Sequence, residues 1–344
     1  MKKFLPALFW CLFLVADLSA QNISAKDSVR IFDDDNPISV TMITDLKMLI
    51  RNKQDGKYQN ALFSCRLPDS TTVSEEILIQ TRGHFRLNHC QIPSLRLNFR
   101  TPKSPRLSFL KELKLVNTCN NRGDYEQLLI KEYLVYKIYN LLTDISFRVR
   151  LLRITYEDIK GQSRPFTQYA FLLENVDAMA KRNGCKELNN IKLHAQVANR
   201  EQMTMVDVFQ YMIGNTDWSV IGNHNIKVIQ PRNDSIANPY PVPYDFDFGG
   251  LVNADYANPP PNLPIQSVRE RLYRGFPRTT EELQKIFDVY NKRKDKIYSL
   301  INNCQQLQAG HKKDMISYLD EFYKSINNKK EVQRIFLDNA RQGG

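Results

Sequence analysis

One stretch, residues 211–250, constrains the fold of this 344-residue chain more than any other. It holds two short apolar segments, residues 225–229 and 242–248, with PRNDSIANP between them. Pro, Asn, Asp and Ser form turns readily, so the pattern predicts two strands joined as a hairpin. Strands joined in this way are antiparallel, so the start of the first is expected to lie beside the end of the second.

The predicted hairpin would gather polar side chains at one end. Asp217 and Asn225 then lie beside Asp245 and Asp247. Because side chains alternate along a strand, the two acids of the second strand share a face, about 7 Å apart, and aromatic residues take the other. Carboxylate and amide oxygens suit a divalent cation. The alternative is that these residues only cap turns and carry no chemistry.

The first twenty residues have the pattern of a secretory signal peptide. Two lysines precede an apolar run that ends at Leu-Ser-Ala, which predicts cleavage after Ala20. The run is too short for a transmembrane helix, and no later stretch is apolar enough to span a bilayer. We therefore expect an exported protein, periplasmic or extracellular, without a transmembrane segment.

Length, charge and cysteines narrow the function classes. The residues after position 20 are too many for one hydrophobic core, so two lobes are expected. The formal charge is +11, and the basic residues are scattered rather than striped. For an exported protein this favours a generic basic surface, or an anionic ligand such as a nucleotide, over nucleic acid. Cys90 and Cys119 flank predicted strands, so we expect them to form a disulfide, while no cysteine or histidine spacing indicates zinc.

Alternating apolar residues predict a strand-rich first half with one long helix. Residues 21–60 are polar, apart from an amphipathic patch at 39–50. The helix is expected to begin after Asp124, which is a good N-cap, and to span residues 125–142. The predicted strands are residues 61–67, 77–83, 95–99, 113–117, 148–157 and 167–175.

From about residue 176 the periodicity becomes helical. Residues 180–215 are expected to be helical with loops, and residues 280–307 and 312–340 are expected to be helices. The predicted fold class is α+β, with a strand-rich N-lobe at 21–175 and a mainly helical C-lobe at 176–344. The hairpin belongs to the second lobe, and the connector lies near Glu174.

Several motifs resemble the CotH-type atypical protein kinases of spore-coat and secreted bacterial proteins. They are Arg82-Gly83-His84, with His in place of the family's Asn, LRLNF, LKLV, KEYLVYKIYN, FLLENVDAM, residues 215–225 and YDFDFGG. The resemblance covers most of residues 75–280. It implies a two-lobed protein kinase-like fold and the use of ATP and Mg²⁺.

The resemblance also implies roles for the residues of the hairpin. Asp217 would orient or deprotonate the acceptor hydroxyl, and Asn225 with Asp245 or Asp247 would hold the metal. Asp247-Phe248-Gly249 spells the kinase tripeptide and favours Asp247. Kinases place four residues between the catalytic Asp and the Asn, but seven separate Asp217 from Asn225, so Asn223 remains an alternative amide ligand.

The nucleotide-binding residues implied by the resemblance lie in the first half. Lys114 stands just before the helix, where a kinase lysine stands, with Glu132 or Glu126 as its partner. Arg96 is an alternative cation, and Glu174 belongs to the connector. Lys114 could also be a surface lysine on an edge strand. No glycine-rich phosphate loop is visible.

Two functional hypotheses follow. The first is an exported CotH-like kinase that transfers phosphate from ATP, with Mg²⁺, to a protein or another hydroxyl-bearing acceptor. The second is a catalytically inactive relative that acts in binding or surface assembly. His224 lies near the acids and is interpreted as a hydrogen-bonded loop histidine. No nucleophile-elbow spacing supports a hydrolase.

Overall fold

The computed structural model describes residues 31–32, 34–66, 71–83, 85–120, 123–189 and 191–341. The predicted signal peptide and His84 lie outside the described residues. Within the described ranges, no helix is both long enough and apolar enough to cross a membrane.

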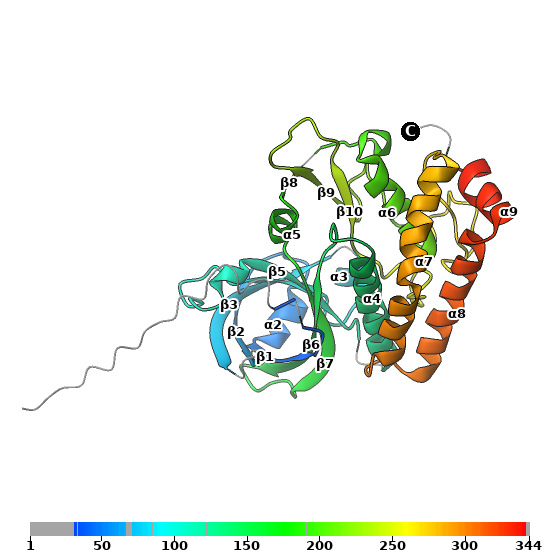
Figure 1. Cartoon of the computed structure of the whole chain (residues 1–344). Coiled ribbons are helices and arrows are strands. Elements are labelled where there is room, and N and C mark those ends of the chain that lie inside the picture. Colours follow the sequence, from blue (N-terminus) through cyan, green and yellow to red (C-terminus); the bar gives the residue numbers. More distant parts are fainter. Residues whose placement is uncertain are drawn as a thin grey trace, which may run out of the picture.

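Seven strands form a closed barrel in the order β1-β2-β3-β4-β5-β7-β6 (Figure 1). Along β3 buried and less buried residues alternate, as expected where one face of a strand points inward. The sequence-predicted strands correspond to β2 through β7. The strands are β1 (Ile38–Thr44), β2 (Gln59–Arg66), β3 (Thr72–Arg82), β4 (Ser94–Asn98), β5 (Glu112–Asn117), β6 (Val149–Asp158) and β7 (Phe166–Leu173).

The expectation of a two-lobed protein kinase-like fold with a strand-rich N-lobe and a helical C-lobe is wrong, because the strands close on themselves. The closing element is β1, which falls partly in the segment interpreted as an amphipathic patch. It pairs antiparallel with β2 and parallel with β6, from Ile38 opposite Leu152 to Thr44 opposite Asp158. A parallel partner so far along the chain leaves no local signal in the sequence. The closed ring has no free edge.

The inside of the barrel is one apolar core. Leu95, Leu97 and Leu115 are fully buried there, and the rings of Phe63 and Phe99 meet edge to face at 5.3 Å. The short helix α2 (Leu46–Arg51) is N-capped by Asp45 and adds two buried leucines to this core. The barrel interior is therefore filled by side chains.

The long helix predicted at residues 125–142 lies beside the barrel in a layer with α7 (Thr280–Asn303) and α8 (Ala309–Ile326) (Figure 1). The predicted helix is confirmed as α4 (Gly123–Leu142), which packs against β6 and β7 on one side and α7 on the other. The expectation that Asp124 is its N-cap is wrong, because Asp124 lies in the first turn of the helix. A second apolar core joins it to the C-terminal helices. The remaining helical segments are α3 (Phe85–His89), η1 (Ser108–Leu110), α5 (Val176–Arg182), η2 (Ala195–Val197), α6 (Arg200–Ile213), α7 (Thr280–Asn303), α8 (Ala309–Ile326), α9 (Lys329–Val332) and η3 (Gln333–Asp338).

The predicted hairpin is confirmed. Strands β9 (Ile226–Pro231) and β10 (Tyr240–Pro243) pair antiparallel, with Pro243 opposite Ile226. A third strand, β8 (Cys185–Glu187), pairs with β9 inside a segment that the sequence predicts to be helical. The second strand of the hairpin ends at Pro243, so the acids that follow it lie on a loop. The predicted shared strand face of Asp245 and Asp247 is therefore wrong.

The predicted disulfide between Cys90 and Cys119 is also confirmed, with 4.5 Å between the Cα atoms. It ties the residue after α3 to a position two residues beyond β5. A second link, from the Gln91 N–H to the Cys119 carbonyl at 2.9 Å, reinforces this connection. A disulfide fits the oxidising environment that an exported protein meets.

Candidate functional site

A cavity of about 370 Å³ lies between the outer face of the barrel and the hairpin. Its size falls within the range of small-molecule sites. Its wall includes residues of β5, β7 and α3, of the loop before β9 and of the loop after β10. The polar side chains of this wall are Arg82, Arg86, Ser94, Lys114, Asp217, His224, Asn225, Asp245 and Asp247.

The loop between Asp217 and Asn225 folds back on itself. Ser219 and His224 exchange two backbone hydrogen bonds, of 2.9 and 3.0 Å, so the chain returns to its starting point. The Asn225 side-chain amide then donates to the Asp217 carboxylate oxygen Oδ2 at 3.0 Å and to its carbonyl at 2.8 Å. The seven intervening residues therefore do not prevent these two residues from meeting.

The alternative amide, Asn223, does not reach the cavity. It is exposed, and its side chain donates to the carbonyl of Ile191 at 2.7 Å. Asn225 has a positive φ of 52°, a conformation that Asn tolerates better than most residues. Between the two amides, the geometry favours Asn225 as the one that faces the acids.

The Asp217 carboxylate is held from both sides. His224 Nε2 lies 2.8 Å from its Oδ1, and Asn225 binds its Oδ2. The Asp217 backbone N–H donates to the side chain of Asn215 at 2.9 Å. The side chain remains 31% exposed, so a ligand in the cavity can reach it.

The loop that carries Asp245 and Asp247 is anchored by its aromatic residue and its glycines. Phe246 is fully buried, with its ring 4.6 Å from that of Tyr136. A Cβ on Gly250 would lie 2.2 Å from the Val268 carbonyl oxygen, so this position requires glycine. Asp245 has a positive φ of 64°, and its backbone N–H donates to the Tyr136 hydroxyl at 2.7 Å.

Asp247 belongs to a buried charge cluster centred on Arg86. The guanidinium of Arg86 lies 3.1 Å from Asp247 Oδ2 and 3.0 Å from Glu132 Oε2. The Tyr256 hydroxyl also donates to Asp247 Oδ2, at 3.1 Å. Burial raises the pKa of Asp247 to about 6, against the opposing effect of Arg86. Burial likewise raises the pKa of Glu132 well above its ordinary value.

Arg86 is the site residue that the sequence analysis missed. It sits on the short helix α3, and it also donates to the Asn117 carbonyl at 2.8 Å. The disulfide holds α3 beside the end of β5, which brings Arg86 to the cavity. The predicted disulfide could have pointed to Arg86 from the sequence, because it places the segment before Cys90 next to the strand that carries Lys114.

Lys114 lines the cavity, but its expected ion pair with Glu132 is absent among the described contacts. Glu132 binds Arg86 instead. The Lys114 ammonium lies 4.4 Å from the centre of the Tyr244 ring. Burial, followed by the nearby charge of Arg82, lowers the pKa of Lys114 to about 7.

Three other predicted nucleotide-binding residues lie outside this cavity. Arg96 forms an ion pair with Glu112 at 3.3 Å. Glu126, the alternative partner for Lys114, accepts a hydrogen bond from the Tyr169 backbone at 2.9 Å. Neither lines the cavity.

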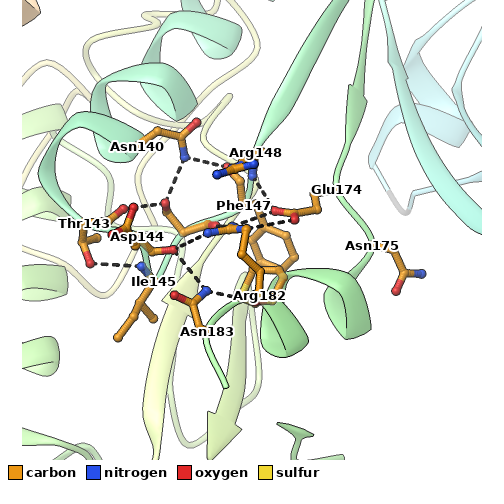
Figure 2. A network of polar contacts seen from close by, with 12 residues as sticks. Asn140, Thr143, Asp144, Ile145, Phe147, Arg148, Glu174, Asn175, Arg182 and Asn183 are labelled. Atoms are coloured by element: carbon orange, nitrogen blue, oxygen red, sulfur yellow. Dashed lines mark hydrogen bonds and ion pairs between the residues drawn. The ribbon is translucent and has the colours of Figure 1, made fainter. Parts of the chain in front are cut away.

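Glu174, the third, holds the connector together (Figure 2). Its carboxylate accepts from the Arg182 guanidinium at 2.9 and 3.2 Å and from the Arg148 backbone N–H at 3.0 Å. It therefore ties the end of β7 to α5 and does not face the acids of the hairpin.

The donor set fits a cation that prefers oxygen. The Asp245 carboxylate, Asp247 Oδ1 and Asn225 Oδ1 accept no hydrogen bond from any described residue. Across the described ranges, however, no three His, Cys, Asp or Glu side chains are grouped to hold a metal. Mg²⁺ commonly uses one or two carboxylates together with phosphate oxygens and water. The free oxygens could therefore contribute some, but not all, of the ligands that a divalent cation needs.

The chain matches no protein-family model and no curated protein. An assignment of function therefore depends on the chemistry of the cavity.

Proposed function

We propose that the cavity binds ATP with Mg²⁺ and that the protein transfers the terminal phosphoryl group to a hydroxyl-bearing acceptor, protein or small molecule. The observation that carries the proposal is the meeting, in one cavity, of Asp217, Asp245 and Asp247 with Lys114 and Arg86. Phosphoryl transfer depends mainly on positioning and on charge neutralisation, which acids and bases around one cavity can supply. The resemblance to CotH-type kinases that we propose concerns the motifs of this site.

Each side chain then has a distinct task. Asp245, Asp247 and Asn225 offer oxygens to the cation, and Lys114 faces the phosphates as a point charge. Bound Mg²⁺ would neutralise phosphate charge. Asp217 orients the acceptor hydroxyl and accepts its proton, while His224 and Asn225 fix the direction of its carboxylate.

Arg86 acts as a positioning residue in this scheme. It binds Asp247 through Oδ2, which leaves Oδ1 directed away from the ion pair. By holding Glu132 at the same time, it fixes the loop of Asp247 against α4. The closed barrel provides a rigid outer surface for this arrangement, so the proposal does not require an open two-lobed fold.

A binding protein without catalysis is a second candidate, because both oxygens of Asp217 are already engaged. His224 contacts one oxygen and Asn225 the other. An acid held in this way can orient a ligand without accepting its proton. This candidate predicts nucleotide binding but no transfer, and it fits a role in surface assembly in the periplasm or outside the cell.

Thermal unfolding with and without Mg²⁺-ATP tests nucleotide binding directly. A ligand at 100 times its Kd stabilises the native state by about 2.7 kcal/mol, so wild type should unfold at a higher temperature with Mg²⁺-ATP. Asp245→Asn should show a much smaller shift, and excess EDTA should remove the Mg²⁺-dependent part. The matched control is Asp295→Asn, an exposed acid on α7. Wild type that does not respond to Mg²⁺-ATP would overturn the proposal.

A further inference from the structure

A second cavity, of about 620 Å³, lies where the end of the barrel meets α5. It shares no wall residue with the first cavity. Part of its wall is apolar: Leu110 and Leu113 belong to the barrel core, and Phe109 packs against that core. Its volume suits a small ligand.

The rest of the wall carries more positive than negative charge. Four of its side chains are basic and two, Glu174 and Asp177, are acidic. Arg182 and Glu174 neutralise each other in the ion pair of the connector (Figure 2). Three basic side chains therefore face one remaining acid.

In the part of the chain that the structure describes, two of these three cations form no contact that supports the fold, and the guanidinium of the third, Arg232, is held only through its Nε. Lys111 and Lys181 are exposed, and neither side chain forms an ion pair or hydrogen bond with any residue that the structure describes. Arg232 donates from Nε to the Cys185 carbonyl at 2.9 Å, which orients its guanidinium. Its two terminal nitrogens have no partner in the described ranges. The wall therefore presents hydrogen-bond donors that have no acceptor among the described residues.

The backbone at Lys111 is held in a rare conformation. Its φ of 57° and ψ of −103° are unusual for a residue with a side chain. The conformation is fixed by two backbone hydrogen bonds, from Lys111 to the Ser108 carbonyl at 3.0 Å and from Phe99 to the Lys111 carbonyl at 2.8 Å. Such strain persists only where surrounding contacts enforce it, and here it sets a lysine at the wall of the cavity.

We propose that this cavity binds a small amphipathic organic anion. The anionic group, a carboxylate, sulfonate or phosphate, would meet Lys111, Lys181 and Arg232, and an aliphatic or aromatic body would lie against the partly buried Phe109. A purely polar anion would leave the apolar wall facing water, and a neutral apolar molecule would leave the cations uncompensated. The site is independent of the proposed nucleotide site.

The test is a fluorescence titration with anilinonaphthalene sulfonate, which has the proposed chemistry. We expect saturable binding of one molecule to wild type and displacement by dodecanoate. Lys181→Glu should weaken binding about tenfold, because it reverses a charge at contact distance. Ala178→Trp, at an exposed wall position on α5, should block binding by filling the cavity.

The matched control is Lys296→Glu, which makes the same charge change at an exposed position on α7. It should leave the affinity of the dye unchanged. Three results would overturn the proposal. They are no saturable binding to wild type, equal affinity in wild type, Lys181→Glu and Ala178→Trp, or a changed affinity in Asp245→Asn, which would place the dye in the first cavity.

Discussion

The interior of the barrel and the layer against its outer face bury very different side chains. The interior is filled mainly with aliphatic and aromatic residues, and strand pairing satisfies its backbone. The outer layer buries Arg86, Glu132 and Asp247, which depend on one another for partners. Burial of charge costs free energy unless it is paired. The contrast predicts that the two regions respond differently to substitution: changes inside the barrel should lower stability alone, whereas changes in the outer layer should also alter ligand binding at the first cavity.

The largest effect on stability is expected from Arg86→Met. It leaves two buried acids without their cation, and such a change costs about 3–5 kcal/mol. Nucleotide-dependent stabilisation should also be lost, because Asp247 is no longer positioned. Denaturant unfolding with and without Mg²⁺-ATP measures both effects. Arg100→Met, at an exposed position after β4, is the control and should change little. An unchanged stability of Arg86→Met would mean that the charge cluster is not buried as described.

The matching change inside the barrel is Leu97→Ala. Leu97 is fully buried, so the loss of apolar contact and the cavity left behind should cost about 2–5 kcal/mol. The shift that Mg²⁺-ATP produces should remain, because this residue does not touch the cavity. The same unfolding experiment measures it. Equal loss of the nucleotide response in Leu97→Ala and Arg86→Met would break the distinction between the two regions.

Removal of the disulfide should affect both regions. Cys90→Ala with Cys119→Ala opens a loop with a sequence separation of 29, and loss of such a link costs about 2–4 kcal/mol. Because the bridge holds α3, which carries Arg86, the nucleotide response should also weaken. Cys304→Ala, at a free cysteine, is the control. A double variant that loses stability but keeps a full nucleotide response would show that α3 does not need the bridge.

The last effect appears only as the pH changes, and it concerns a buried acid away from both cavities. Asp207 is buried on α6, 3.9 Å from Arg278, with Arg274, Arg341 and the Tyr273 hydroxyl nearby. Burial raises its pKa to about 7, against the opposing effect of these arginines.

Because the folded-state pKa of Asp207 lies above its unfolded value, its contribution to stability is present at low pH and is lost as the pH rises toward 7. The loss is at most about 1.4 kcal/mol per pH unit. Asp207→Asn cannot ionise, so its unfolding free energy should fall less than that of wild type between pH 4 and pH 7. Parallel pH profiles for the two proteins would contradict this account.

The parts of the fold with local patterns were predictable from sequence. β4 and β5 have alternating apolar residues, α4 has a helical apolar periodicity, and the hairpin of β9 and β10 surrounds a turn-rich segment. The closure of the barrel was not predictable in this way, because it depends on parallel pairing of β1 with a strand far along the chain. That single pairing separates the observed barrel from the expected open sheet.

The site was predictable to a similar extent. Asp217, Asn225, Asp245 and Asp247 lie close in sequence to one hairpin, so its turn brings them together. Arg86 was missed because it reaches the site through the disulfide and a short helix, neither of which has a periodic signal.

The most direct test of the central claim is transfer of labelled phosphate from Mg²⁺-ATP to the protein and to a mixture of hydroxyl-bearing peptides and sugars. Wild type should transfer label, and Asp217→Asn should be about 10²–10⁴-fold slower, as expected for loss of a proton acceptor. Asp295→Asn should match wild type. No transfer by a wild type that Mg²⁺-ATP stabilises, or equal transfer by wild type and Asp217→Asn, would contradict a phosphotransferase in which Asp217 accepts the proton.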